Sequence, residues 1–306
     1  MINAVDHWKA QGLDYSKILY RPKVGEEVGT YATQEQDHLL DRALDNTTIL
    51  ELCRPAIDNY EKVHAELDII NVNRVVGTIT GSEITRRHGA AGLPEDTIHL
   101  KLNGSAGQSL GAFCTKGMTF ELEGDANDYI GKGLCGAKII VYPPKCSPPE
   151  LIADQNIIVG NVAFYGATSG EAYMAGVAGE RFCVRNSGVH TVVEGVGDHA
   201  CEYMTGGSVT CLGSTGRNFG AGMSGGYAYV WDVDGRFEQR LNPNSNLELS
   251  WGMPLEDLEL IHSLIVRHVE LTGSERGRMI LQNWEDEKRR FAKVVSEEYK
   301  ALLAKR

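Results

Sequence analysis

The sequence lacks paired cysteines, a long apolar run and an excess of positive charge. Its 7 Cys form no C-x-x-C pair and are odd in number, which argues against a zinc site and a closed disulfide framework. With 30 Lys and Arg against 41 Asp and Glu, the net charge of −11 disfavours nucleic-acid binding. No apolar run approaches the roughly 20 residues of a membrane helix, and the first residues do not resemble a signal peptide. These absences indicate a cytoplasmic protein with reduced thiols and with neither nucleic acid nor membrane as a partner.

Glycine, in contrast, is abundant and unevenly distributed. Of the 35 Gly, 24 lie within residues 104–226 of the 306-residue chain. Many recur at a spacing close to 19 residues, as Gly207 and Gly226 do, and the whole segment 197–207 aligns with 216–226 at that spacing. A fixed period of this kind is the signature of a repeat architecture. The hydrophobic content of 42% is enough for a sizeable core.

The repeat length predicts a right-handed parallel β-helix, a single-stranded solenoid in which each repeat is one coil, or rung. A unit of 19 residues is too short for a strand, a helix and two turns, but its extended chain of roughly 60 Å closes one triangular rung. Phe120 to Glu123 alternates apolar and acidic residues, like a strand with one buried face. We expect an all-β dominated fold of about seven or eight stacked rungs, with an N-terminal α/β arm and a C-terminal helical cap.

Glycines at the rung corners are expected to hold this solenoid together. A corner needs either a positive φ or a close approach of the neighbouring rung, and glycine tolerates both. The candidate structural corner glycines are Gly124, Gly136, Gly188, Gly197, Gly206, Gly207, Gly216, Gly225 and Gly226. No catalytic, cofactor-binding or metal-binding residue is assigned from these patterns.

The period divides the chain into three regions. Residues 1–96 are expected to form an arm and N-terminal cap, residues 97–232 the parallel β-helix, and residues 233–306 a C-terminal helical cap. Caps are expected because an open solenoid exposes unpaired strand edges. In the last region an apolar stripe predicts a helix over residues 254–273. The prolines of residues 143–149 cannot donate to a strand ladder and predict a protruding loop.

The first region mixes helix and strand signals. Helices are expected over residues 6–19 and 37–57, and alternation predicts a strand over residues 62–70. Thr80 to Glu83 has capping-box spacing, so a short helix is expected over residues 81–88.

Two polar groups invite a chemical interpretation. The string from Gly131 to Gly136 could cradle a phosphate with its backbone N–H groups, but it lacks the G-x-x-x-x-G-K-[ST] motif and its glycines follow the rung period. The second group, a conceivable metal or acid–base cluster, consists of Asp125, Asn127, Asp128, Asp198 and His199. Asx residues at corners more often hydrogen-bond to backbone, so a structural interpretation is favoured for both groups.

Glu121 and Glu123 are the paired carboxylates that a carbohydrate-active β-helix would need, although strand alternation explains them as a solvated face. Histidines and cysteines without metal-ligand spacing or a partnered base are interpreted as structural. They are His190, His199, His262, His268, Cys183, Cys201 and Cys211.

Distinctive strings span nearly the whole chain. They are HWKAQGLD from residue 7, QDH from 36, RVVGT from 74, GSAGQS from 104, EGDANDY from 123, YGATSGE from 165, GERFCVRNSG from 179 and EGVGDH from 194. Together they closely resemble the C-terminal glycine-rich (GXGXG) domain of the glutamate synthase large (alpha) subunit. Departures are mild: Leu39 stands where that family usually has Gly, and Cys135-Gly136-Ala137 replaces a more usual Ser-Gly-Gly.

The resemblance implies a structural and assembly role within an oxidoreductase of glutamate biosynthesis. In that family an amidotransferase domain releases ammonia from glutamine, and an FMN barrel with an iron–sulfur cluster makes glutamate from 2-oxoglutarate. The implied partners are these two domains and, through the parent enzyme, an electron-donating small subunit or ferredoxin. The resemblance transfers no catalytic residue and no cofactor to this chain. The arm carries apolar residues that cannot all be buried within one short segment and therefore predict an interface with neighbouring domains: Trp8, Leu13, Tyr15, Ile18, Leu19 and Tyr20.

Two alternatives stay open from the sequence. The chain could be a separately encoded β-helix subunit of a split glutamate synthase or a related amidotransferase-type complex. With less support, it could be a carbohydrate-active β-helix enzyme. The electron donor, whether NADPH, NADH or ferredoxin, and the oligomeric state are not encoded in these patterns.

Overall fold

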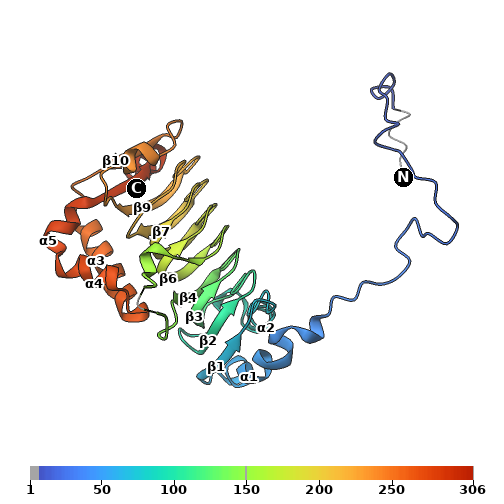
Figure 1. The fold of residues 1–306 in the computed structure, drawn as a ribbon, viewed down its shortest axis with the longest axis horizontal. Coiled ribbons are helices and arrows are strands. Elements are labelled where there is room, and N and C mark those ends of the chain that lie inside the picture. The colour runs from blue at the N-terminus through green and yellow to red at the C-terminus, as the bar shows by residue number, and fades with distance from the viewer. Residues whose placement is uncertain (1–6, 149, 306) are drawn as a thin grey trace. The chain divides into compact units, whose positions relative to one another are not determined.

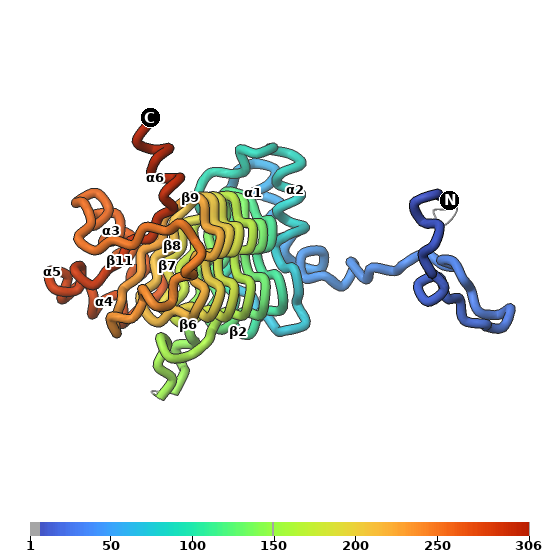
Figure 2. Tube along the Cα trace, turned by 90° about the horizontal axis from the view of Figure 1, so that it is seen from above, coloured from blue at the N-terminus to red at the C-terminus, as the bar shows by residue number. Residues whose placement is uncertain are grey.

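The computed structural model describes residues 7–148 and 150–305, in two units divided between Leu39 and Leu40. The larger unit is a parallel β-helix (Figure 1), which confirms the fold predicted from the glycine period. In Figure 2 the successive rungs are nested behind one another along the solenoid. Among the helices of the described residues, none has the length and apolar character needed to span a membrane.

The parallel strands follow one another in chain order through a single 11-stranded sheet. They are β1 (Val63–Ile69), β2 (Ile98–Ala106), β3 (Met118–Ala126), β4 (Cys135–Tyr142), β6 (Ser169–Ala178), β7 (Ser187–Val196), β8 (Thr205–Cys211) and β9 (Gly225–Trp231). A short strand, β5 (Ile157–Val159), pairs with β3 and β6. The predicted strand over residues 62–70 is confirmed as β1, which already pairs in register with β2.

Most of the helices lie before or after this stack in the chain. They are the 3-10 helix η2 (Leu40–Arg42), the π-helix η3 (Asp45–Ile49), α1 (Leu50–Asn59), α2 (Thr78–His88), α3 (Leu255–Thr272), α4 (Glu275–Gln282), α5 (Trp284–Glu287) and α6 (Glu297–Leu303). Further 3-10 turns are η4 (Gly89–Ala91), η5 (Ala153–Gln155), η6 (Phe237–Arg240) and η7 (Lys288–Arg290). The helical character expected over residues 37–57 is thus confirmed from Leu40 onward.

Apolar side chains stack in columns inside the solenoid. One column, followed through the strand register, is Leu100, Phe120, Ile139, Ala172, Thr191, Val209 and Ala228, of which Thr191 is the one polar member. Every member is completely buried. Burying one Leu, Val or Phe side chain contributes roughly 1.5–3 kcal/mol, so such columns are a main source of stability.

Six of the rungs also contain a five-residue segment whose first, third and fifth residues have a positive φ. We call these the alternating segments. They are residues 109–113, 129–133, 162–166, 181–185, 199–203 and 218–222. Only some of these left-handed positions hold glycine, and the others include Val162 and Phe164. Left-handed backbone costs a residue with a side chain about 1–2 kcal/mol, so the segments need strong compensation.

The compensation comes from hydrogen bonds to the rungs on both sides. Tyr129 N–H donates to Asn161 O of the following rung at 2.9 Å, and Gly131 N–H donates to Leu110 O of the preceding rung at 2.8 Å. The fifth residue of the segment again donates forward, and this pattern recurs in every alternating segment that has a rung on each side. The alternating segments therefore tie the rungs together in both directions.

A buried carboxylate ends this ladder at the N-terminal end. Gly77 has a φ of +93° and occupies the third position of the first rung, where no preceding carbonyl exists. Its N–H donates instead to Asp45 Oδ2 at 2.8 Å, and the N–H and hydroxyl of Thr80 donate to Asp45 Oδ1 at 2.9 and 2.7 Å. Asp45 is only 2% exposed. A carboxylate thus replaces the missing rung.

The same contact corrects the expected boundaries of α2. The helix ends before Gly89 as predicted, but it begins at Thr78 rather than at residue 81. The capping-box interpretation of Thr80 is wrong, because its hydroxyl bonds to Asp45 and not to the N-terminus of its own helix. Helix α1 covers the open end beside it, and Ile49, Cys53 and Ile57 are completely buried in the core cluster of the solenoid.

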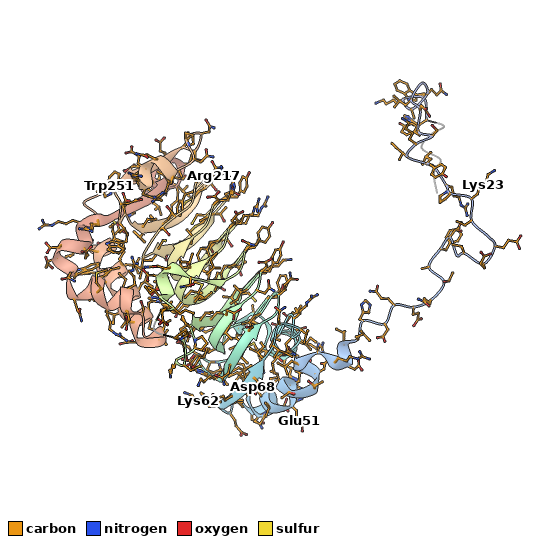
Figure 3. All side chains as sticks on the ribbon, viewed as in Figure 1. Lys23, Glu51, Lys62, Asp68, Arg217 and Trp251 are labelled. Atoms are coloured by element: carbon orange, nitrogen blue, oxygen red, sulfur yellow. The ribbon has the colours of Figure 1, made fainter. Side chains whose placement is uncertain are left out.

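The C-terminal helices cover one side of the solenoid (Figure 1). The outward-facing Tyr173, Val192 and Leu212 join Ile261 and Ile265 of α3 in a second apolar cluster. Helix α3 ends at Gly273, as its apolar stripe predicted. After the last parallel strand, β11 (Phe291–Ser296) pairs antiparallel with β9, and β10 (Leu247–Ser250) pairs antiparallel with β11. Trp251, just after β10, lies at this end of the unit together with Arg217 (Figure 3).

Two irregular regions complete the chain. The loop that follows β4 leaves the rungs and protrudes, as its prolines predicted, although Pro149 lies outside the described residues (Figure 2). The smaller unit, up to Leu39, has local turns only, so the helix expected over residues 6–19 is wrong for the part that is described, from residue 7. Gly12 has a φ of +93°, and Trp8 and Ile18 are 69% and 79% exposed, so no packing supports a short helix there.

The expected corner glycines divide by physical cause. Gly124, Gly136, Gly207 and Gly226 have a positive φ. The others are Gly188, Gly197, Gly206, Gly216 and Gly225, whose φ is ordinary and at which an added Cβ would lie within 3.1 Å of backbone or side-chain atoms of the neighbouring rung. At Gly206 that Cβ would be 2.2 Å from Ser187 O.

We predict that Asp45→Ala lowers the free energy of unfolding by at least about 2 kcal/mol, because it leaves buried N–H donors unpaired. Asp45→Asn keeps the volume and one acceptor oxygen and should lose less. Urea unfolding followed by circular dichroism measures both. An unchanged midpoint for Asp45→Ala would show that the first rung does not need this carboxylate.

We predict that Gly206→Ala lowers stability by about 1–3 kcal/mol, because the methyl group forces the rungs apart. Gly166→Ala is the matched comparison. Gly166 has a φ of +63° and no atom within 4 Å of an added Cβ, so that variant isolates the left-handed strain, about 1 kcal/mol. If Gly206→Ala unfolds at the wild-type temperature, the corner role of Gly206 is wrong.

Candidate functional site

The polar corner residues form a ladder of backbone hydrogen bonds. Asp128 Oδ1 accepts the N–H of Asn161 at 2.7 Å, and Asn161 Oδ1 accepts the N–H of Glu180 at 2.8 Å. Further along, Asp198 Oδ1 accepts the N–H of Arg217 at 2.9 Å, a bond that lowers the pKa of this carboxyl. Each oxygen joins one rung to the next, so the structural interpretation of these Asx residues is confirmed.

The other members of this suspected cluster are separately engaged. Asp125 accepts a hydrogen bond from Ser105 Oγ at 2.7 Å, and the Asn127 amide donates to Asn71 at 3.0 Å. His199 Nδ1 lies 2.7 Å from Glu202 Oε1. Among the described residues, no group of three or more His, Cys, Asp and Glu side chains is arranged to hold a metal ion.

In the glycine-rich string 131–136, the N–H groups of Gly131, Gly133 and Cys135 are already used in hydrogen bonds between rungs and cannot cradle a phosphate. Gly131 and Gly133 are the third and fifth residues of an alternating segment, and their N–H groups donate to Leu110 O and Tyr165 O of the adjacent rungs. Cys135 N–H donates to a neighbouring rung as well. These bonds confirm the structural interpretation that the sequence favoured for this string.

Glu121 and Glu123 do not form a pair suited to glycoside chemistry. Glu121 is half-buried and accepts hydrogen bonds from His99 Nε2 at 2.8 Å and Tyr142 Oη at 2.5 Å. The His99 hydrogen bond, with that of Tyr142, lowers the pKa of Glu121 to about 2 despite partial burial. A carboxyl that is ionised over the whole neutral range cannot serve as a general acid. Glu123 Oε1 accepts a hydrogen bond from the backbone N–H of Lys145 at 3.0 Å.

The suspected nucleophilic cysteines are inert. Cys183, Cys201 and Cys211 are completely buried inside the solenoid, and burial raises the pKa of each thiol, for Cys211 to about 12. Cys183 and Cys201 occupy third positions of alternating segments, where the side chain enters the core. Since the thiolate is the nucleophile, these residues are packing groups.

The histidines have mostly single partners. His190 Nδ1 lies 2.8 Å from Ser208 Oγ, and the ring of His262 packs against Trp284 with centroids 5.0 Å apart. His268 differs, because it is completely buried and its Nε2 lies 3.4 Å from Glu194 Oε1. Its Nδ1 has no hydrogen-bond partner among the described residues.

Glu194, His268 and Ser274 form a buried polar cluster that the sequence did not reveal. Glu194 lies on β7, His268 on α3, and Ser274 is the N-cap of α4, where its hydroxyl accepts the N–H of Gly277 and donates to Glu194 Oε1. All three side chains are at most 3% exposed. Because serine and histidine both contact the carboxylate rather than each other, this is not a nucleophile–base pair. The cluster fixes the helices to the solenoid.

The chain was compared with the models of known protein families. The family model described as the GXGXG motif matches residues 45–297, which include the whole rung stack. The chain belongs to this GXGXG family.

Three similar proteins are glutamate synthases. The Bacillus subtilis glutamate synthase [NADPH] large chain is 52% identical over 304 residues, 98% of this chain and 19% of the relative. The Schizosaccharomyces pombe glutamate synthase [NADH] is 48% identical over 274 residues, 90% of this chain and 13% of the relative. Ferredoxin-dependent glutamate synthase 2 of Synechocystis is 46% identical over 289 residues, which are 94% of this chain and 18% of the relative. The GXGXG chain thus spans less than a fifth of the length of these relatives.

The residues of this GXGXG chain do not fit an iron–sulfur cluster, a cofactor implied by the resemblance. Such a cluster needs several cysteine thiolates that converge on one point. Here five of the seven cysteines are buried at dispersed rungs and helices, and only Cys135 and Cys146 are exposed. No step of the chemistry is therefore assigned to this chain through a cluster.

We predict a pH-dependent contribution of Glu121 to the stability of the GXGXG fold. Its folded-state pKa of about 2 lies below the ordinary value of 4.5, so the contribution is complete above pH 4.5 and is lost as the pH falls towards 2. Glu121→Gln should be less stable than wild type by on the order of 2 kcal/mol at pH 7, and the difference should shrink steadily below pH 4.5. Urea unfolding between pH 7 and pH 3 measures this difference.

Glu51→Gln is the control for Glu121→Gln. Glu51 is an exposed residue of helix α1 at the N-terminal end of the unit (Figure 3). This control should track wild type at every pH. A difference between Glu121→Gln and wild type that stays constant down to pH 3 would contradict the assigned role.

Proposed function

We propose that this chain is the β-helix domain of a glutamate synthase and that its role there is structural. The observation that carries the proposal is the 52% identity to a glutamate synthase large chain over 98% of the present sequence. In such an enzyme, glutamine, 2-oxoglutarate and a reductant give two glutamates. The chain contributes no catalytic group and no cofactor, and FMN and the iron–sulfur cluster belong to other domains.

The proposed role is to hold the amidotransferase and FMN domains at a fixed separation, so that ammonia passes between their sites without escaping. A solenoid suits this role because each alternating segment bonds to both neighbouring rungs. The side covered by α3 and α4 adds a second apolar layer. Such a body resists bending better than a chain of loosely linked elements.

The role is independent of the electron donor. Relatives named for NADPH, NADH and ferredoxin are 52%, 48% and 40–46% identical to this chain, so no kind of enzyme stands far apart from the others. A domain that selected the donor would be expected to diverge among the three kinds of enzyme. We therefore place donor selection outside this chain.

The first unit supplies the proposed contact with neighbouring domains. Trp8, Ile18, Tyr20 and Tyr31 are between 69% and 84% exposed. Apolar side chains exposed so close together in sequence usually mark an interface. The test is to mix the 306-residue chain with the remaining domains of the synthase, to measure complex formation by size-exclusion chromatography and to assay glutamate formation.

We predict that Trp8→Ser with Ile18→Ser and Tyr20→Ser abolishes association with the other domains, because it removes the exposed apolar contacts. The far-UV circular dichroism of the solenoid should stay unchanged, since these residues lie in the first unit. A matched control replaces three basic residues of the same unit, Lys9, Lys17 and Lys23, by Ser. If the apolar triple variant binds like wild type, the first unit is not the interface.

A further inference from the structure

A cavity of about 780 Å³ lies on the outer side of the solenoid, beside the buried cluster of Glu194, His268 and Ser274. Its floor is formed by side chains of successive strands, among them Glu121, Ala175 and Glu194. The turn between α3 and α4, residues 270–276, forms one wall, and the proline-rich loop after β4 forms another. Three parts of the chain that are distant in sequence thus enclose one space.

The floor carries the carboxylate of Glu194, of which only one oxygen has hydrogen-bond partners in the described part of the chain. The side chain of Glu194 is 2% exposed, and its Oε1 receives the Ser274 hydroxyl and faces His268 Nε2. Among the described residues no donor hydrogen-bonds to Oε2, although Glu194 contributes to the lining of the cavity. Oε2 is not among the fully buried side-chain atoms that lack a partner, so it is open to the cavity and available to a cationic donor.

The rest of the lining is negative as well. Glu121, Glu270 and Glu275 add three carboxylates. Of the two basic residues, Arg276 is already paired with Asp154, and Lys145 is exposed on the loop. The C-terminal turn of the 18-residue helix α3 also borders the cavity, and the carbonyls at such a helix end carry partial negative charge.

Apolar groups complete the walls and limit the chemistry of the occupant. They are Pro143, Pro144, Pro148, Leu151, Ile152, Ala175 and Leu271. Within the described residues, the carboxylates are not grouped as a metal site requires. The space is also far larger than a bare ion, so it suits a cation with an apolar stem.

We propose that this cavity binds an organic cation, a guanidinium or primary ammonium group, with Glu194 Oε2 as the main acceptor. Glu121, Glu270 and Glu275 supply the negative field around it, and the prolines contact the stem. The same group can come from a free amine or from an arginine or lysine side chain of another protein domain. This site does not depend on the proposed bracing function.

The experiment is isothermal titration calorimetry of the 306-residue chain with agmatine, which carries both cationic groups. A second titration uses the peptide acetyl-Gly-Arg-Gly-amide, and 1,4-butanediol serves as the uncharged probe. We expect saturable one-site binding of agmatine and none of butanediol. Tighter binding of the peptide than of agmatine would identify a side chain as the natural source, and the reverse order would identify a free amine.

Variants locate the site. Glu194→Gln should weaken agmatine binding at least tenfold. Because Glu194 also anchors α3 and α4, a second variant avoids the buried cluster: Glu270→Gln with Glu275→Gln, both exposed on the wall, should weaken binding about threefold to tenfold. Its control, Glu256→Gln with Glu259→Gln, removes the same charge from exposed positions of α3 outside the cavity.

The control separates a specific site from the general attraction of a chain of net charge −11 for cations. Equal weakening by the two double variants would overturn the proposal, as would the absence of saturable binding of both agmatine and the peptide. Retained binding in the control, with loss in the cavity variants, would support it.

Discussion

The whole structure depends on backbone N–H groups that reach neighbouring rungs in both directions from residues with positive φ. Placing Val162, Phe164 or Cys183 in the left-handed region costs about 1–2 kcal/mol each, while one backbone hydrogen bond contributes a net of only about 0.5–1.5 kcal/mol. The conformation is favourable only when rungs on both sides and the buried columns act together. The rungs therefore stabilise one another, and no single rung is expected to fold alone.

Much of the fold could be predicted from the sequence, because glycine spacing and strand alternation are local signals. The rungs, the loop after β4 and the end of α3 at Gly273 follow from them. The alternating segments could not be predicted, since β-branched and aromatic residues normally avoid positive φ and only three-dimensional packing imposes it. The role of Asp45 was also hidden, because its partner Gly77 lies 32 residues away and no local capping pattern joins them.

In the candidate site, too, some residues could be interpreted correctly from the sequence and others could not. Asp128 and Asp198 could be interpreted correctly as structural because Asx residues at turns have a known preference for backbone partners. Glu121 looked like a solvated residue from strand alternation, yet His99 and Tyr142 on adjacent strands half-bury it and hold it ionised. The cluster of Glu194, His268 and Ser274 joins residues up to 80 apart, so no spacing rule could have found it.

The two ends of the solenoid are closed by different means, and this makes its length finite. A stack of identical parallel rungs is in principle open to indefinite growth, as in fibrils, if one copy adds to the edge of another. Here Asp45 occupies the acceptor position that an added rung would need, and β11 reverses direction against β9 at the other end. The final strand, β10, has only 4 residues. The same chain that builds a regular stack therefore also terminates it, and protects a highly repetitive sequence from filament formation.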